Sequence, residues 1–300
     1  MAAPTAETAE QTRARHLGVL GVFIGFIGFA TSAPLVAGSD LEGLAVGVWR
    51  AAIACAGFAL LSAAFGKLSW QAFRLTAAPG LSFGIATGLF FEAAQRTSVA
   101  NATLIAAMQP VATVVAARFV FGERVGIGDA GWVLTALGGG TFMILVADSG
   151  GTADFTGDLI AVSSIAFTLG YFVMSRKARQ SVDTVPFMMG LMFWAGIVLL
   201  PMALIAGQDL TPGDGTEWLR LVAVAALPGG GHLLINNAHR FVPFLVIGVL
   251  QLLLPVFSTL FAWWFLDQTI NAGQALGMAI VIGALTAHAV YRSRLTPVGA

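Results

Sequence analysis

Long apolar runs dominate the hydrophobic pattern of this chain. Ten runs of mostly apolar residues alternate with short polar linkers, none of them long enough to form a soluble domain. A helix needs about 20 apolar residues to cross some 30 Å of hydrocarbon. The pattern therefore predicts an all-α integral membrane protein with ten membrane-spanning helices, at residues 17–36, 43–65, 72–94, 98–120, 127–147, 157–177, 185–206, 217–238, 242–265 and 271–291.

Composition also indicates that the lipid bilayer is the solvent of this chain. Hydrophobic residues make up 57% of the 300 residues and charged residues only 10%, whereas soluble domains carry about a quarter charged residues. The formal net charge of zero lacks the basic excess that nucleic-acid binding needs, so no nucleic-acid partner is expected. The single cysteine, Cys55, excludes an intramolecular disulfide and a Cys-rich metal site. No metal or cofactor is predicted.

Lys and Arg residues are distributed unevenly between the two sets of linkers. If the N-terminus is inside, twelve of the 15 lie in inner segments, Arg96 and Arg220 lie in outer loops, and Arg50 lies within the second span. Because cytoplasmic loops retain positive charge, the N-terminal tail (1–16) and the C-terminal tail (292–300) are both expected in the cytoplasm. The first apolar run is longer than the apolar core of a signal peptide, so it is interpreted as a retained span.

The two halves of the chain are related by an internal repeat. A shift of 145 residues aligns seven identical positions without a gap. The basic loop Gly122-Glu123-Arg124 then matches Asp267-Gln268-Thr269, which has no cation, as expected for loops on opposite sides of the membrane. Five spans per half force the second half to be inverted. The predicted units are a first five-helix repeat at 17–147 and a second, inverted one at 157–291. The identical first-half positions are Pro110, Val111, Ala117, Gly128, Ala130, Gly138 and Thr141.

Short motifs in the first half form a familiar set. They are the small-residue stretch 97–102, Pro110, Gly122-Glu123, the glycine-rich helix through Gly138-Gly139-Gly140, and Arg50 in the second span. Together they resemble the EamA-type members of the drug/metabolite transporter superfamily. The second half repeats the proline, as Pro255, but has Asp267-Gln268 where the Gly-Glu pair would be.

This resemblance implies a ten-helix exporter of small metabolites in a bacterial-type inner membrane. The spacing is most similar to that of exporters of aromatic and other neutral amino acids. The implied partners are a small-molecule substrate and membrane lipid, and the implied assembly is a monomer or a homodimer.

Arg50 is the first candidate for contact with substrate. A charged side chain within a span costs a few kcal/mol and usually faces a cavity or a partner. Two interpretations stay open. The guanidinium binds a substrate carboxylate or forms a gate with an acid such as Glu92, or it snorkels to the outer surface.

The eighth span contains an unusual segment, Pro228-Gly229-Gly230-Gly231. Proline removes one helical hydrogen bond and glycines weaken the helix, so the segment is expected to unwind or bend near mid-membrane and to line a cavity. The side chains that follow, His232, Asn236 and Asn237, are candidate substrate contacts. His232 is interpreted either as a proton carrier or as a neutral packing residue.

Matching prolines and scattered aromatic residues complete the candidate set. Pro110 and Pro255 are expected to kink the fourth and ninth spans, as hinges or as static bends. The 22 Phe and only two Tyr favour an apolar cavity that accepts a ligand with an apolar side chain. The remaining candidate lining residues are Trp49, Phe83, Phe90, Tyr171 and Trp194, with the polar residues Asn101, Gln109 and Gln251.

The sequence thus predicts an exporter that works by alternating access of two inverted repeats around a central apolar cavity. It contains neither a phosphate-binding Walker loop nor a His-Glu-x-x-His or Gly-x-Ser-x-Gly motif, so no enzymatic activity is expected. Three alternatives stay open: an exporter of another metabolite or drug class, a passive channel, and a membrane-embedded enzyme with His232 or His239 as its base.

Overall fold

The structure is a computed structural model that describes residues 9–64, 70–96, 108–146, 155–265, 267 and 269–295. Every regular element within these ranges is a helix, which confirms the predicted all-α class. The helices are α1 (Ala9–Ala30), α2 (Ser32–Ala37), α3 (Gly43–Ala64), α4 (Trp70–Leu75), α5 (Ala77–Arg96), α7 (Gln109–Phe119), α8 (Ile127–Leu145), α9 (Phe155–Ala178), α10 (Thr184–Ile205), α11 (Gly215–Ala238), α12 (Phe244–Gln251), α13 (Leu254–Phe265) and α14 (Ala272–Leu295).

Seven helices in the described ranges are long and apolar enough to cross a membrane. They are α1, α3, α9, α10, α11, the α12–α13 segment and α14. A helix suits the bilayer because it satisfies its own backbone hydrogen bonds where no water is present. The other three predicted spans coincide with α4 and α5, with α7, and with α8.

Three of the predicted spans are interrupted, which their hydropathy does not reveal. The first is divided at Thr31 between α1 and α2, the third at Thr76 between α4 and α5, and the ninth between α12 and α13. The hydroxyls of Thr31 and Thr76 each donate to a carbonyl three residues earlier, at 2.7 Å, and so compete with the helical ladder. Pro255 has no N–H for the carbonyl of Gln251, where α12 ends.

The two prolines that the 145-residue shift aligns lie at equivalent positions in their helices. Pro110 is the second residue of α7 and Pro255 the second residue of α13. The first turn of a helix tolerates proline because its N–H groups have no intrahelical partner there. Pro110 therefore lies in the first turn of α7, where the described part of the fourth span begins, and the kink expected there stays a prediction because residues 97–107 lie outside the described residues.

The prediction of an unwound segment at 228–231 is wrong. Helix α11 runs without interruption from Gly215 to Ala238, with Pro228 inside it. Close packing against α1 explains the glycines, since a Cβ atom at Gly25 would lie 2.9 Å from the carbonyl oxygen of Gly231 and one at Gly28 would lie 2.7 Å from that of Leu227. Small residues let two helix backbones approach closely, so α1 supports α11 where its own hydrogen bonding is weakest.

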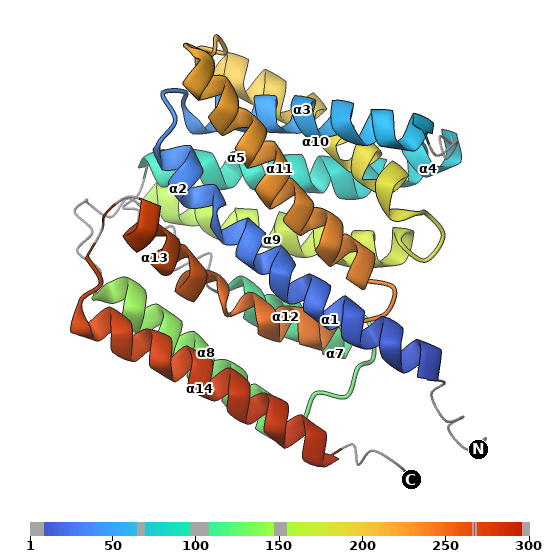
Figure 1. Ribbon diagram of the computed structural model, residues 1–300, viewed down its shortest axis with the longest axis vertical. Helices are drawn as coiled ribbons and strands as arrows, with labels where there is room; N and C mark the ends of the chain where they lie inside the picture. The colour runs from blue at the N-terminus through green and yellow to red at the C-terminus, as the bar shows by residue number, and fades with distance from the viewer. Residues whose placement is uncertain are drawn as a thin grey trace.

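Helix packing follows the division of the chain into two halves. Helix pairs that join one half to the other include α1 with α11, α5 with α9, α3 with α10, α7 with α12 and α8 with α14. If each span is replaced by its equivalent in the other half, the α1–α11 pair becomes the α5–α9 pair. The same replacement leaves the α3–α10, α7–α12 and α8–α14 pairs unchanged. Figure 1 shows α8 and α14 side by side at one edge of the bundle.

The pairs that map onto themselves are antiparallel. In the α8–α14 pair, Gly128 lies against Tyr291 and Gly273 against Val146. In the α7–α12 pair, Gln109 bonds to Gln251 while Thr113 lies against Gly248. A twofold axis perpendicular to the helices produces antiparallel pairs of this kind, so the packing has the form expected of inverted repeats.

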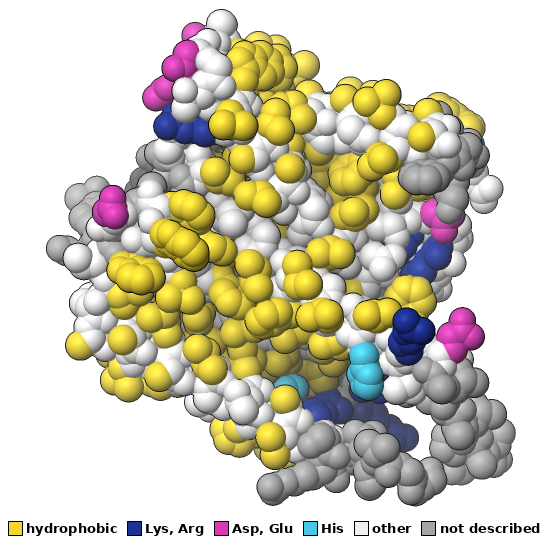
Figure 2. Space-filling model, in the orientation of Figure 1, with side chains coloured by type: hydrophobic (Ala, Val, Ile, Leu, Met, Phe, Trp, Pro, Cys, Tyr) yellow, Lys and Arg dark blue, Asp and Glu magenta, His cyan; other side chains and the backbone are white. Residues whose placement is uncertain are grey.

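The visible surface of the bundle is largely apolar. Figure 2 shows hydrophobic side chains across its broad central part, while Lys and Arg gather mainly towards the edge near both termini. Exposed hydrophobic side chains of the described residues include Phe23, Ile24, Leu227 and Leu276. Such a surface is stable next to lipid chains and would associate in water.

Candidate functional site

A cluster of buried polar and aromatic side chains lies where α3, α5, α9 and α11 meet. Its members are Arg50, Phe83, Tyr171, His232 and Asn236, and each is at most 7% exposed. We call these five residues the central polar cluster. All five were candidates from sequence, but their separation along the chain gave no indication that they would meet.

Tyr171 connects the polar members of the cluster. The Nδ2 of Asn236 donates to the Tyr171 hydroxyl at 2.8 Å, and this hydroxyl lies 3.1 Å from Nδ1 of His232. In the tautomer in which Nδ1 accepts the hydroxyl proton of Tyr171, the neutral His232 carries its own proton on Nε2. The ring of His232 is held in place by Phe83 and Phe29, at centroid distances of 4.8 and 4.3 Å.

Two polar atoms of the cluster have no hydrogen-bond partner among the described residues. They are Nε2 of His232, a donor in this tautomer, and Oδ1 of Asn236, an acceptor. A buried polar atom without a partner costs about 1–3 kcal/mol. A ligand that supplies one acceptor and one donor would remove this cost.

Arg50 supplies a positive charge next to these atoms. Its guanidinium carbon lies 5.5 Å from the centroid of the Phe83 ring, and the residue is 7% exposed. The side chain therefore lies inside the bundle and does not snorkel to the outer surface. None of the ion pairs seen among the described residues involves Arg50, and the suggested gate with Glu92 stays a prediction.

Three aromatic candidates lie outside the central polar cluster. The indole of Trp49 donates to the carbonyl of Leu210 at 2.7 Å, and that of Trp194 donates to the carbonyl of Phe73 at 3.1 Å. Phe90 packs against Phe91. The first bond joins α3 to the loop after α10 and the second joins α10 to α4, so these tryptophans have a structural explanation that periodicity alone does not provide.

The other polar candidates do not all lie together in the structure. Gln251 donates to Gln109 at 2.8 Å where α7 and α12 pack together. Asn237 is exposed and accepts a hydrogen bond from Thr184 at 2.9 Å. Asn101 lies outside the described residues.

A second polar region, which the sequence did not reveal, lies at the end of the bundle that carries the termini. Arg179 is fully buried and donates from Nε to the carbonyl of Asn236 at 3.0 Å. Burial, together with the nearby charge of Arg240, lowers the pKa of Arg179 to about 10. His239 packs between Phe172 and Phe244. These residues appear in sequence as ordinary loop cations and a helix-end histidine, with no pattern that marks them.

A third polar group joins α8 to α14. Arg292 contacts both carboxylate oxygens of the buried Asp129, at 2.7 and 2.8 Å, and Nε2 of His288 lies 2.9 Å from the same carboxylate. Asp129 also accepts from the amide of Gly126 at 2.8 Å and so caps α8. This carboxylate is fully occupied by structural partners.

The fold and the buried cluster define a multi-pass helical membrane protein with a polar centre. The chain belongs to the EamA-like transporter family, whose model matches twice, at residues 16–146 and 155–287. These two matches correspond to the two halves that the 145-residue shift relates. The family is described as one of transporters.

The similar proteins do not point to the amino-acid exporters that the sequence motifs resemble. It is 26% identical to solute carrier family 35 member G1 of Mus musculus over 219 residues, which are 68% of this chain and 58% of that protein. It is 25% identical to a chloroplastic WAT1-related protein of Arabidopsis thaliana over 213 residues, 66% of this chain and 50% of that protein. The chain thus spans little more than half the length of these relatives, and neither name refers to amino acids.

A solved crystal structure supports the fold independently. It has 20% sequence identity to this chain and a TM-score of 0.79, and the match covers 95% of this chain and 99% of that one. At this level of identity the likeness concerns the fold alone.

Proposed function

We propose that the chain exports aromatic and other neutral amino acids by alternating access of two inverted five-helix repeats. The observation that carries this proposal is the central polar cluster. A cation, a hydrogen-bond donor and a hydrogen-bond acceptor without described partners surround an aromatic ring in the interior of a transporter. This combination complements a zwitterion with an apolar side chain.

In this proposal, each part of the ligand has a named partner. The carboxylate binds the guanidinium of Arg50 and accepts from Nε2 of His232, while the ammonium donates to Oδ1 of Asn236. The apolar side chain packs against Phe29 and Phe83. Other solutes with one acidic and one donating group would satisfy the same atoms, so an exporter of another metabolite class is the second candidate.

Packing and charge support the proposed topology. The seven apolar helices, together with α5, α7 and α8, would form ten spans, and the antiparallel pairs are those of inverted repeats at 17–147 and 157–291. Figure 1 shows the start of α1 and the end of α14 at the same end of the bundle, as an even number of spans requires. The Lys and Arg count supports a cytoplasmic position for this end, and the proposed membrane is the bacterial-type inner membrane that the family resemblance implies.

The geometry of His232 does not favour the enzyme alternative. A histidine base is usually oriented by a carboxylate, whereas the ring of His232 is oriented by the Tyr171 hydroxyl. A neutral phenol holds the ring without raising its basicity strongly. A ligand contact therefore explains this histidine better than acid–base catalysis.

Uptake by proteoliposomes tests the proposal. Purified protein should show saturable uptake of labelled phenylalanine, tryptophan, threonine or methionine, and unlabelled neutral amino acids should compete. Arg50→Gln should reduce uptake strongly at low substrate concentration, whereas Arg118→Gln, at the exposed end of α7, should leave it unchanged. Measurements with and without a pH gradient show whether transport is coupled to protons. Folded, inserted protein that transports none of these solutes would remove the amino-acid assignment.

A further inference from the structure

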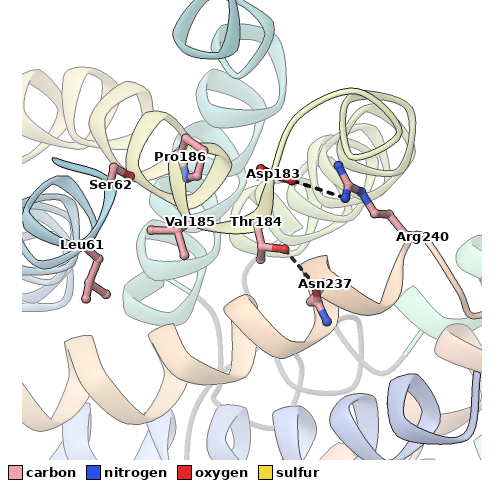
Figure 3. Close-up of a pocket in the computed structure, with 8 residues that line it drawn as sticks. All are labelled: Leu61, Ser62, Asp183, Thr184, Val185, Pro186, Asn237 and Arg240. Atoms are coloured by element: carbon pink, nitrogen blue, oxygen red, sulfur yellow. Dashed lines mark hydrogen bonds and ion pairs between the residues drawn. The ribbon is translucent and has the colours of Figure 1, made fainter. Parts of the chain in front are cut away.

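A pocket of about 350 Å³ opens between the ends of α3, α10 and α11 (Figure 3). Its volume lies at the lower end of the range of small-molecule sites. Its lining combines the apolar Leu61 with polar side chains: Ser62, Asp183, Thr184, Asn237 and Arg240. Only Asn237 among these was a candidate from sequence.

Ser62 provides the clearest sign of a ligand in this pocket. The residue is fully buried, and its hydroxyl has no hydrogen-bond partner within the described ranges. A buried hydroxyl without a partner destabilises a protein. A solute in the pocket would supply the missing partner.

The two charged side chains that line the pocket have opposite signs, and Arg179 adds a positive charge behind Thr184, to which it donates a hydrogen bond. Nη1 of Arg240 lies 3.4 Å from Oδ1 of Asp183, and their side chains are 30% and 49% exposed. An anion would meet Asp183 and a cation would meet Arg179 and Arg240, so a molecule that carries both charges satisfies more of these groups than an ion of one sign. Thr184 bonds to Oδ1 of Asn237, and Figure 3 shows the amide nitrogen of Asn237 turned away from that bond.

The pocket lies close to the central polar cluster along α11. Asn236 and Asn237 are consecutive residues, one fully buried in the cluster and the other exposed at the pocket. Consecutive residues on a helix face directions about 100° apart, since there are 3.6 residues per turn. The cluster and the pocket therefore lie on different faces of α11 at nearly the same height along its axis.

We infer that this pocket is a first binding site for a small zwitterionic or neutral polar solute, which it holds before the solute reaches the central polar cluster. The inference rests on the proposed function for the identity of the solute and for the cytoplasmic position of this end. The Ser62 hydroxyl and the Asn237 amide bind the polar groups of the solute, and Leu61 contacts its apolar part.

Protection of an introduced thiol measures binding without depending on transport. Cys55 is the only cysteine, so Cys55→Ser gives a background for single thiols. In this background, Asn237→Cys places a thiol in the pocket, and Ser181→Cys places one on an exposed residue between α9 and α10 that does not line it. The thiols are labelled with a small charged maleimide, with and without each labelled amino acid used in the uptake assay.

A solute bound in the pocket slows labelling at position 237 only. At a solute concentration about ten times its dissociation constant, the labelling rate at position 237 should fall about tenfold, while position 181 should label at an unchanged rate. Adding Ser62→Ala should raise the protecting concentration about fivefold. The same change should not lower the melting temperature without solute, because it removes an unsatisfied hydroxyl.

The outcomes separate this inference from the proposed function. Transport without protection at position 237 would overturn the pocket and leave the function standing. Protection by a solute that is not transported would support the pocket and contradict the function. Equal protection at both positions, or no effect of Ser62→Ala, would also overturn the pocket as a binding site.

Discussion

Glu123 and Arg176 form an ion pair of 2.8 Å that joins the two halves of the protein. Glu123 lies between α7 and α8, and Arg176 lies in the last turn of α9. The same carboxylate accepts hydrogen bonds from the backbone amides of Phe244 and Leu245, at 2.8 and 2.9 Å, and so caps α12. A carboxylate at a helix N-terminus is favourable for both hydrogen bonding and the helix dipole. Glu123 thus fixes three segments at the end of the bundle near the termini.

Removing the charge of Glu123 should loosen this end. Glu123→Gln keeps one acceptor oxygen but loses the ion pair and one of two charge-assisted bonds, so we expect a loss of about 1–3 kcal/mol of stability. Amide exchange at Phe244 and Leu245 should accelerate at the same time. Thermal melting in detergent and hydrogen exchange measure the two effects.

The control for this prediction is Glu42→Gln. Glu42 is an exposed acid just before α3, so its neutralisation should cost at most about 0.3–1 kcal/mol and should not change the exchange at Phe244 and Leu245. Equal effects of the two substitutions would show that the Glu123 contacts do not hold α12 in place.

The role of the glycines in α11 gives a second prediction. Gly231 is against the backbone of α1, whereas Gly230 has open space around the position of a Cβ atom. Gly231→Ala should therefore force α1 and α11 apart and cost about 1–3 kcal/mol. Gly230→Ala should be neutral or stabilise by about 0.5–1 kcal/mol, because alanine is the better helix former. Melting curves of both variants test this, and an equal loss from both would contradict the packing explanation.

These glycines also show what the sequence could and could not predict. Apolar runs predicted the all-helical class because the bilayer requires about 20 apolar residues per crossing, and seven helices in the described part of the chain are long and apolar enough to cross it. The segment 228–231 was misinterpreted because local propensity favours a break there, while the contact of Gly231 with Gly25 on α1 overrides it. That contact joins residues more than 200 positions apart, and nothing local indicates it.

The candidate site was predicted only as a set of residues. Buried polar residues within apolar runs identified Arg50, His232 and Asn236, since such residues are rare in spans and usually face the interior. Their connection through Tyr171 depends on the packing of α9 against α5 and α11, which no spacing encodes. Trp49 and Trp194 were candidate lining residues because of their large aromatic rings. Their indole N–H groups instead donate to backbone carbonyls outside the central polar cluster.

The 145-residue relation extends to backbone conformation and gives a third prediction. Gly122 and its equivalent Asp267 both have positive φ, 64° and 51°. Gly122→Ala should cost about 1–2 kcal/mol, because this region strains a residue with a Cβ atom. Gly131→Ala is the control, since both glycines have open space for a Cβ but Gly131 lies within α8. It should instead stabilise slightly. A thermal shift of the same sign in both variants would contradict a strained turn at position 122.

The buried histidine beside the two arginines gives a pH prediction. Burial first, and then the charges of Arg176 and Arg179, lower the pKa of His239 to about 3. A histidine in the unfolded chain has a pKa of about 6.5. Below that pH the unfolded state binds a proton that the folded state does not, so stability falls as the pH decreases towards 3.

We therefore expect the melting temperature to fall between pH 7.5 and pH 5. Well below pH 6.5 the contribution of His239 approaches about 1.4 kcal/mol per pH unit. His239→Phe, which keeps a ring between Phe172 and Phe244, should reduce this pH dependence. His16→Gln is the control, because His16 is exposed near the start of α1 and should leave the slope unchanged. An unchanged slope in His239→Phe would mean that this histidine already takes up a proton in the folded protein, through water that reaches it from the terminal end of the bundle.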